Sequence, residues 1–292
     1  MLLLFALVNN LRSLRRFLPV LFAAALSCGA VSPAPASAQS SSSSVASADT
    51  TYPLAVGHRD VLVSLPANHD PARAYPVLLV FGGRGASPEE VARTTGLRPG
   101  SDAIIAYARG VDNAWAGAPY ALTGMAEDVS YARAIVDSVA AQHPVDRSRV
   151  GAVGHSNGGA FALALACRAP DLLSGAVSVS GMFYEPVDAG CLSGGVPVML
   201  IHAGNDDVAL IDGGVRHGAP FHSAGEIFQR WGARNHCLPV TVDRSTAGPD
   251  LSHRAWTGCH AETDMVVSAS AGHPWPAHAS ALARDFLSRQ SG

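Results

Sequence analysis

The sequence predicts an α/β fold: a single domain with a mostly parallel sheet and helices on both of its faces. Short apolar runs typical of buried strands alternate along the chain with segments whose apolar residues recur at helical spacing. One strand–helix junction carries the glycine-rich segment GHSNGG at residues 154–159. The chain has 292 residues, 48% of them hydrophobic, which suffices for one large domain of this class. We find no internal repeat and no sign of a second domain.

The expected strands are continuous apolar runs, as in sheets whose strands are buried on both faces. They cover residues 77–81, 103–108, 149–153, 176–179, 196–201 and 265–268. Apolar spacing and composition predict helices over residues 127–142, 158–168, 223–234 and 277–288. A further helix is expected to start after Ser87, which would cap it, with Pro88 at its first position and Glu90 in a capping box.

The charged residues exclude several functions. All 20 basic residues are arginines, and the 23 acidic residues bring the formal net charge to −3. A chain without lysine can form neither a lysine Schiff base nor a P-loop. Nucleic-acid binding needs a basic surplus that displaces counterions, so we expect no nucleic-acid partner.

The first 38 residues have the pattern of a secretory signal peptide. Arg12, Arg15 and Arg16 form a basic cluster, residues 17–26 form a short apolar run, and ASA at residues 36–38 fits a cleavage site. The apolar run has about half of the roughly 20 residues that a transmembrane anchor needs. We therefore expect a secreted or periplasmic protein.

The alternative mode of export is a lipoprotein anchor at Cys28, and without that lipid we expect no membrane contact. Residues 39–56 are predicted to form a serine-rich flexible linker, because they include a run of serines and offer no core of their own. The catalytic domain is expected to occupy residues 57–292.

The cysteines of the mature chain predict two disulfides. Cleavage after residue 38 would remove three arginines, no acidic residue and one cysteine, which leaves a net charge of −6 and four cysteines. An even number of cysteines in an exported protein favours disulfides, and four cysteines allow three pairings. We favour Cys167–Cys191 and Cys237–Cys259, which join neighbours in the sequence. A zinc site at the last two cysteines and the histidines beside them is disfavoured by the lack of a CxxC spacing.

Ser156 is the predicted nucleophile. The segment at residues 154–159 matches G-x-S-x-G and lies between a predicted strand and a predicted helix, which is typical of a nucleophile elbow. Glycines suit the flanking positions because larger side chains would clash in so tight a turn. The amino end of the following helix adds a partial positive charge that favours an oxyanion.

A serine nucleophile needs a base to remove its proton and a carboxylate to orient that base. In nucleophile-elbow enzymes the order along the chain is serine, acid, histidine. Of the 12 histidines, His273 is best placed, because it follows the last predicted strand and precedes the last predicted helix. The acid should follow the strand at 196–201, where Asp206 and Asp207 are neighbours. Adjacent side chains rarely point at one target, so we expect only one of them to orient the histidine.

A family resemblance supports these assignments. The segment from Asp128 to Gly181, which contains VGHSNGG, closely resembles the polyhydroxybutyrate-depolymerase-like esterases of the α/β-hydrolase superfamily. That group includes LpqC-type lipoprotein esterases and feruloyl and acetylxylan esterases. The resemblance continues in PVMLIHAGNDDV (197–208), WGARNHC (231–237) and GHPWP (272–276), and covers nearly all of the chain from about residue 57. It implies an α/β-hydrolase domain and a serine esterase with the triad Ser156, Asp206 and His273.

The expected reaction is a two-step acyl transfer that requires no metal or cofactor. The backbone N–H groups of Gly83 and Asn157 are expected to hold the oxyanion. The family usually has His-Gly after its oxyanion strand, whereas this chain has Phe81-Gly82-Gly83. The oxyanion donors are backbone groups, so they do not depend on the missing histidine. The loop that carries them is expected to have a different shape.

We expect an ester- or amide-linked oligomer or polymer as the substrate, with a polyhydroxyalkanoate oligomer or related polyester as the first choice. The chain up to Gly292 leaves no room for a separate adsorption domain, which favours soluble oligomers or small esters over solid polymer. Trp115, Tyr184 and Trp275 are candidate pocket residues, although such aromatic residues are as often part of the core.

Other functions remain open at this point. One is a feruloyl or acetylxylan esterase acting on plant polysaccharide, and another is a poly(aspartic acid) hydrolase that cuts amide bonds with the same triad. A peptidase, an acyltransferase and a non-catalytic polysaccharide-binding module are further alternatives. The net charge of −6 disfavours a polyanionic substrate, unless Arg84, Arg93 and Arg98 form a basic patch at the mouth of the site.

Overall fold

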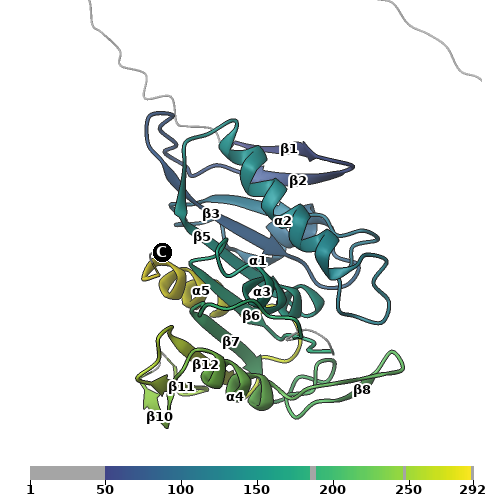
Figure 1. Ribbon diagram of the computed structural model, residues 1–292, viewed down its shortest axis with the longest axis vertical. Coiled ribbons are helices and arrows are strands. Elements are labelled where there is room, and N and C mark those ends of the chain that lie inside the picture. The colour runs from purple at the N-terminus through teal and green to yellow at the C-terminus, as the bar shows by residue number, and fades with distance from the viewer. Residues whose placement is uncertain (1–49, 185–188, 246–247, 291–292) are drawn as a thin grey trace, which may run out of the picture. The chain divides into compact units, whose positions relative to one another are not determined.

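Ten strands form one sheet in the computed structural model, which describes residues 50–184, 189–245 and 248–290 (Figure 1). The strand order is β1-β2-β4-β3-β5-β6-β7-β12-β11-β10, and β8 and β9 form a separate hairpin. The strands are β1 (Thr51–Val56), β2 (Arg59–Ser64), β3 (Tyr75–Phe81), β4 (Ile104–Ala108), β5 (Val145–His155), β6 (Gly175–Val179), β7 (Val198–Ala203), β8 (Gly214–Arg216), β9 (Ala219–Phe221), β10 (Leu238–Arg244), β11 (Leu251–Thr257) and β12 (Thr263–Ser268).

The centre of the sheet is parallel, from β4 through β3, β5, β6 and β7 to β12, whereas the strands at both edges are antiparallel. This arrangement confirms the predicted α/β class with a mostly parallel sheet. In the register of the sheet, Phe81 of β3 lies beside Gly154 of β5, and His155 of β5 lies beside Val179 of β6. The carboxyl ends of neighbouring strands therefore meet at one edge, where the loops that follow them come together.

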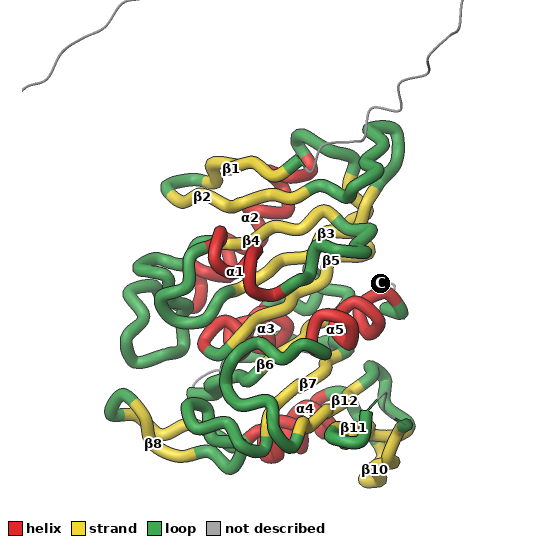
Figure 2. Tube along the Cα trace, turned by 180° about the vertical axis from the view of Figure 1, so that it is seen from behind, coloured by secondary structure: helices red, strands yellow, loops and turns green. Residues whose placement is uncertain are grey.

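Helices cover both faces of the sheet, as predicted. Helices α2 (Met125–Ala140), α3 (Asn157–Arg168) and α4 (Ala224–Arg234) lie on the face toward the viewer in Figure 1. Helices α1 (Pro88–Thr95) and α5 (Ala279–Ser288) lie on the opposite face, which is turned toward the viewer in Figure 2. Parallel strands joined by helical crossovers produce this layered arrangement, because each crossover must pass over one face of the sheet.

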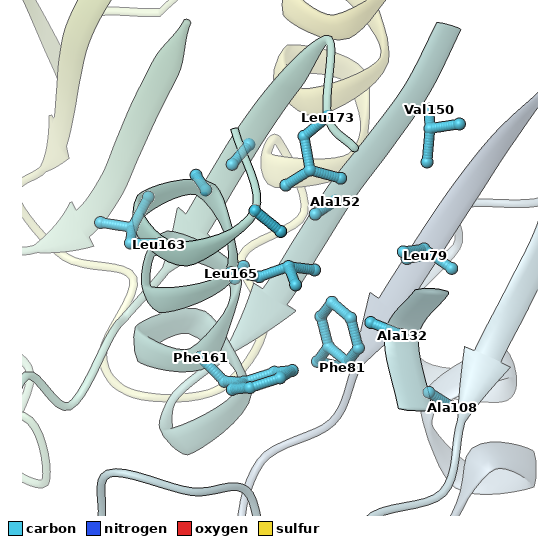
Figure 3. Close-up of a cluster of buried hydrophobic side chains, with 14 of the residues drawn as sticks. Leu79, Phe81, Ala108, Ala132, Val150, Ala152, Phe161, Leu163, Leu165 and Leu173 are labelled. Carbon is cyan, nitrogen blue, oxygen red and sulfur yellow. The ribbon is translucent and has the colours of Figure 1, made fainter. Parts of the chain in front are cut away.

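The larger hydrophobic core lies between the sheet and α2, α3 and α4. Figure 3 shows the part of this core around α3. Phe81 and Phe161, both fully buried, meet edge to face with their ring centroids 4.9 Å apart. Leu79 and Ala132 pack in the same cluster. Full burial of one large apolar side chain stabilises the folded state by about 1.5–3 kcal/mol. The contacts of Phe81 and Phe161 therefore hold the end of β3 firmly against α3.

Serine caps fix the start of two helices. Ser87 Oγ accepts a hydrogen bond from the Glu90 N–H at the start of α1, where Pro88 occupies the first turn as predicted. Ser223 Oγ accepts from the Glu226 N–H at the start of α4. Such caps satisfy amide groups that have no partner inside the helix.

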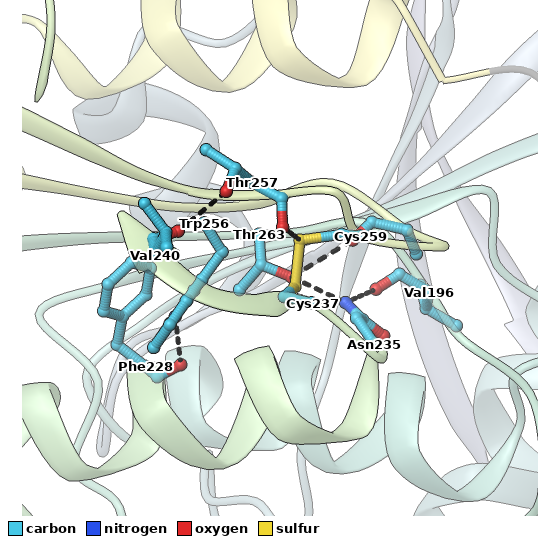
Figure 4. Close-up of a disulfide and its surroundings, with 10 residues drawn as sticks. Val196, Phe228, Asn235, Cys237, Val240, Trp256, Thr257, Cys259 and Thr263 are labelled. Carbon is cyan, nitrogen blue, oxygen red and sulfur yellow. Dashed lines mark hydrogen bonds between the residues drawn. A yellow bond between two sulfur atoms is a disulfide. The ribbon is translucent and has the colours of Figure 1, made fainter. Parts of the chain in front are cut away.

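Two disulfides join the cysteines of the described residues, with the expected pairing. Cys167 at the end of α3 is bonded to Cys191, and Cys237 before β10 is bonded to Cys259 after β11 (Figure 4). The second bond sits beside Asn235, whose side-chain amide donates to Val196 O at 2.9 Å. The sulfur atoms that the zinc alternative required are therefore bonded to each other, and they are not available as thiolate ligands.

Part of the predicted linker is a strand. Residues 51–56 form β1, which pairs along its whole length with β2, so the folded domain begins earlier than the expected boundary at residue 57. Residues 51–56 include both polar and apolar side chains instead of a continuous apolar run. This composition is tolerated because β1 lies at the edge of the sheet and only its last residue, Val56, is buried. The signal peptide over residues 1–38 and the rest of the linker lie outside the described residues. Within the described ranges, no helix has the length and apolarity needed to cross a membrane.

Candidate active site

Ser156 stands at the carboxyl edge of the sheet, between the end of β5 and the start of α3. Its φ of +53° and ψ of −118° lie in a region that residues with a side chain rarely adopt. Backbone strain of this kind costs about 1–3 kcal/mol and is found most often at functional sites. The motif's predicted strand–turn–helix context is therefore present, with the serine at the point of the turn.

The glycines of the motif are required by close backbone contacts. A Cβ on Gly154 would lie 2.0 Å from Gly158 O, and a Cβ on Gly158 would lie 2.2 Å from Phe81 O. Both values are far below any contact that carbon and oxygen tolerate, so that a side chain would push α3 away from β3 and β5. The turn can place Ser156 beside the end of β3 only because both positions lack a side chain.

His273 links Ser156 to Asp206. The His273 Nε2 atom lies 3.1 Å from Ser156 Oγ, and its Nδ1 atom lies 2.9 Å and 3.0 Å from the two carboxylate oxygens of Asp206. Asp206 follows β7 and His273 follows β12, so that the two adjacent strands bring them together. The neighbouring Asp207 is exposed and takes no part in this chain of contacts. Of the two candidate acids, the geometry thus selects Asp206.

The Asp206 carboxylate is held ionised in a buried position. Burial alone would raise its pKa, but hydrogen bonds from His273 and from the N–H groups of Val208 and Ala209 outweigh burial, and the pKa lies below its usual value. His202 lies 3.8 Å away, and burial lowers the pKa of its ring. The neutral ring of His202 donates to Ala209 O at 2.7 Å and adds no second positive charge beside the carboxylate.

The loop that carries His273 is fastened at two points. His155 donates from Nε2 to the backbone carbonyl of His273 at 2.8 Å, and Asn205 Oδ1 accepts from the Gly272 N–H at 2.8 Å. Burial lowers the pKa of His155 to about 4, although its hydrogen bond to the His273 carbonyl favours the protonated ring and raises the pKa. His155 is therefore neutral near pH 7, and its ring serves as a fixed support. Sequence reasoning did not identify this role, although His155 stands inside the motif itself.

The predicted oxyanion donors lie on either side of Ser156. A Cβ placed on Gly83 would be 3.4 Å from Ser156 Cβ, which puts this residue against the serine. Asn157 is the first residue of α3, where a backbone N–H has no acceptor inside the helix. The buried Asn157 side chain clamps Trp115, accepting from its backbone N–H at 2.7 Å and donating to its carbonyl at 3.1 Å.

Two of the three predicted pocket aromatics belong to the core, and their assignment to the pocket was wrong. Trp115 is 2% exposed, stacks on Phe161 with centroids 5.1 Å apart, and donates from Nε1 to Gly82 O at 3.0 Å. It supports the loop after β3 from behind. Tyr184 is also 2% exposed and lies in a small buried cluster with Phe221. Only Trp275 lines the cavity that contains Ser156.

That cavity has a volume of about 510 Å³, which suits a small organic ligand. Besides Ser156, His155, His273 and Trp275, the side chains that line it are those of Arg84, Ala86, Glu90, Val91, Thr94, Thr95, Tyr120, Met182, Val208, Arg216, His217 and Pro274. Arg216 and His217 were not predicted, because they come from the β8–β9 hairpin, far from the motif in the sequence.

The basic patch that would favour a polyanionic substrate is only partly present. Of the three arginines proposed for it, Arg84 lines the cavity, while Arg93 is exposed on α1 and does not reach it. Arg98 lines a different cavity, together with residues 66–68 and 99–102. Among the described residues, no group of three or more histidine, cysteine, aspartate or glutamate side chains is arranged to hold a metal ion.

Comparison with known proteins identifies the class and then the family. The order of the sheet, the strained serine between strand and helix, and the Ser–His–Asp contacts are those of a carboxylic ester hydrolase with the α/β-hydrolase fold. The chain belongs to the family described as "Putative esterase", whose sequence profile matches residues 56–249.

Named relatives are similar to this chain over different lengths. It is 36% identical over 144 residues to "Putative esterase NocK" of Nocardia uniformis subsp. tsuyamanensis, a match that covers 47% of this chain and only 42% of that relative. It is 26% identical over 229 residues to "Probable feruloyl esterase C" of Aspergillus terreus, covering 73% of this chain and 75% of the relative.

A solved structure confirms the fold. The acetyl xylan esterase from Aspergillus awamori superposes with a TM-score of 0.62 at 12% identity, over 82% of this chain and 99% of that one. At this low identity the likeness concerns the architecture alone. It agrees with the α/β-hydrolase domain implied by the sequence resemblance.

Proposed function

We propose that the protein hydrolyses carboxylic esters with Ser156 as the nucleophile, His273 as the general base and Asp206 as the orienting acid. The observation that carries this proposal is the short contact of 3.1 Å between Ser156 Oγ and His273 Nε2, with Asp206 on the far side of the ring. A base within hydrogen-bonding reach of a serine hydroxyl is what converts that hydroxyl into a nucleophile.

The reaction follows two steps of acyl transfer. His273 takes the proton of Ser156 Oγ while that oxygen attacks the acyl carbon, and the resulting imidazolium then protonates the departing alcohol. A water molecule, deprotonated by His273, next attacks the acyl carbon. The bond between that carbon and Ser156 Oγ breaks, His273 returns the proton to Ser156 Oγ, and the acid is released. Asp206 stabilises the imidazolium in both steps because its carboxylate remains ionised. The N–H groups of Gly83 and Asn157 are the proposed oxyanion donors, each worth about 3 kcal/mol in the transition state.

For the substrate we propose an ester of plant polysaccharide of the feruloyl or acetylxylan type. The names of the relatives support this choice over our first expectation of a polyhydroxyalkanoate oligomer, since the relatives that cover most of this chain are feruloyl esterases C. The non-catalytic alternative loses its basis, because all three residues of the triad are present and in contact.

The triad is tested by hydrolysis of p-nitrophenyl acetate and butyrate. Replacing Ser156 by alanine is expected to lower kcat by about 10⁴-fold or more, because the covalent step is lost. Circular dichroism and the melting temperature show whether the variant is folded. A folded Ser156→Ala protein that keeps wild-type turnover would refute the mechanism.

The substrate is tested by comparing four compounds with wild-type protein: methyl ferulate, acetylated xylan, hydroxybutyrate oligomers and poly(aspartic acid). We expect the largest kcat/KM with methyl ferulate or acetylated xylan. If the hydroxybutyrate oligomers are hydrolysed fastest, the polyester assignment replaces this one. If poly(aspartic acid) is cut fastest, the substrate is an amide.

We also propose that the protein is exported and matures by cleavage after residue 38. The two disulfides support this view, because such bonds form in oxidising compartments. The mass of the mature amino terminus decides between the two modes of export. A free terminus at Gln39 supports the secretory signal, whereas a diacylated Cys28 supports the lipoprotein anchor.

A further inference from the structure

One side of the cavity that contains Ser156 is cationic and aromatic. Arg84, Tyr120, Arg216 and His217 line it, and they come from the loop after β3, the loop before α2 and the β8–β9 hairpin. The Arg84 guanidinium carbon lies 4.3 Å from the centroid of the Tyr120 ring. The His217 ring meets the same tyrosine edge-on, with centroids 5.0 Å apart. These contacts hold the three segments together at the cavity rim.

The positive charge of this rim has no carboxylate partner inside the described part of the protein. Arg84 makes one long contact of 3.4 Å to His217 Nδ1, and Arg216 donates once, at 3.4 Å, to Val208 O. Neither forms an ion pair with a carboxylate of the described residues. Several arginines outside the cavity do form ion pairs: Arg59 and Arg133, for example, each bind a carboxylate oxygen at 2.8 Å or less. A guanidinium has five N–H donors, so most donors of the two rim arginines are open to a ligand.

The neighbouring groups leave this charge in place. Burial and the two arginines lower the pKa of His217, so that the histidine is neutral near pH 7 and the arginines alone carry the charge. The one acidic side chain among the described residues that line the cavity is Glu90, which belongs to α1 and forms no ion pair with either arginine. Arg84 directly follows Gly83, where an added Cβ would lie 3.4 Å from Ser156 Cβ, and Arg84 lines the same cavity as Ser156.

We propose that Arg84 and Arg216 form a carboxylate-binding subsite, and that among polysaccharide esters of the proposed class the protein prefers those with a free carboxylate close to the scissile bond, such as the carboxylate of a uronic acid residue. The planar guanidinium matches the two oxygens of a carboxylate, and charge-assisted hydrogen bonds of this kind are stronger than neutral ones. Met182 and Val208, which line the same cavity, provide apolar surface for the carbon chain that joins the carboxylate to the ester. The inference rests on the proposed reaction at Ser156 and specifies what that reaction selects.

The subsite is tested with pairs of esters that differ in one charge. In the acyl pair, monoethyl glutarate is compared with ethyl pentanoate, in which a methyl group replaces the carboxylate. In the alcohol pair, 3-acetoxybutyrate is compared with its methyl ester. We expect kcat/KM to be about tenfold higher for the charged member of at least one pair, as expected for a hydrogen-bonded charge. The pair that shows the preference tells on which side of the scissile bond the carboxylate binds.

Variants assign the preference to the rim. Arg84→Gln and Arg216→Gln should each lower the ratio of charged to neutral kcat/KM by about tenfold, and the Arg216→Lys variant should recover part of it. Arg93→Gln, an exposed arginine on α1 outside the cavity, is the matched control and should keep the wild-type ratio. Free glutarate should inhibit the hydrolysis of ethyl pentanoate by the wild type, a measurement that depends on no variant.

The outcomes separate this inference from the proposed function. A wild type that hydrolyses the neutral esters at Ser156 but shows a ratio near one in both pairs overturns the subsite and leaves the mechanism intact. A preference that the Arg93→Gln variant loses as strongly as the rim variants also overturns it. Hydrolysis that survives Ser156→Ala in a folded protein overturns the mechanism itself.

Discussion

The elbow and the rim of one cavity are built in different ways. The elbow is a short continuous segment whose glycines approach the neighbouring backbone so closely that no side chain fits, and whose Asn157 is fully enclosed. The rim combines Arg84, Tyr120 and Arg216 from distant segments, and long or aromatic contacts hold them. Tight backbone packing fixes the position of a reacting atom, whereas partly exposed side chains can change without disturbing the sheet.

This difference predicts two kinds of variant. Changes at the elbow and its supports should lower the hydrolysis of every ester or destabilise the fold. Changes at the rim should mainly alter the choice between esters. The following variants test that distinction, in order of decreasing expected effect.

Asp206→Asn should reduce kcat by about 10³–10⁴-fold for all esters, because an amide neither stabilises the imidazolium nor selects the required tautomer. Asp207→Asn, an exposed neighbour, is the matched control. Steady-state kinetics on one charged and one neutral ester measures both. Equal losses in the two variants would contradict the assignment of Asp206 as the acid.

Gly158→Ala should destabilise the protein by at least about 2 kcal/mol, since its Cβ would meet the backbone oxygens of Phe81 and Gly82 at 2.2 Å and 2.4 Å. Gly225→Ala in α4 is the control, because its added Cβ meets nothing closer than 4.0 Å. That change should be neutral or stabilise by about 0.4–1 kcal/mol. Urea unfolding measures both variants, and a Gly158→Ala protein as stable as the wild type would show that the elbow is less constrained than we infer.

His155→Gln should flatten the dependence of stability on pH. Folding lowers the pKa of His155 from 6.5 to about 4, so the unfolded chain binds more protons between these values and stability falls as the pH decreases through them. The titration of His155 alone should lower the free energy of unfolding of the wild type by about 2 kcal/mol between pH 7 and pH 5. Glutamine can still donate to the His273 carbonyl but does not titrate.

Urea unfolding at pH 7, 6 and 5 tests this prediction under non-reducing conditions. The exposed His58 provides the control variant His58→Gln, which should keep the wild-type slope. If the free energy of unfolding of His155→Gln depends on pH as strongly as that of the wild type, His155 is protonated in the folded protein, contrary to its burial.

Tyr120→Leu is expected to have the smallest effect. It removes the aromatic face beneath Arg84, a contact worth about 0.5–1 kcal/mol at a partly exposed site. The ratio of charged to neutral kcat/KM should fall by about twofold to fivefold, with little change in melting temperature. If the hydrolysis of both members of a pair falls equally, the rim contributes to the reaction itself rather than to selection.

The sequence predicted best those features that depend on residues close together in the chain. The parallel strands, the helices and the turn around Ser156 followed from patterns within short segments, and His273 followed from its place after the last strand of the parallel region. The pairing of the cysteines agrees with the choice of neighbours in the sequence, but residue patterns alone left three pairings open. Of the adjacent aspartates, residue patterns could not select one, and the family resemblance was needed to name Asp206.

Residues whose role depends on distant packing were harder to predict. Trp115 and Tyr184 are aromatic residues of the kind that often line pockets. In the folded chain, however, contacts from α3 and the β8–β9 hairpin bury them. Arg216 carries no local signal, because nothing near it in the sequence indicates that its hairpin reaches Ser156. The antiparallel strands β1, β2, β10 and β11 were not predicted, because their sequences lack the long continuous apolar runs of the parallel strands.

The nucleophilic role of Ser156 is tested most directly by a fluorophosphonate probe and mass spectrometry of the labelled peptides. We expect one adduct per molecule, on the peptide that contains Ser156, and no such adduct in the folded Ser156→Ala variant. A folded wild-type protein that does not react, or that reacts at another residue, would contradict the proposed mechanism.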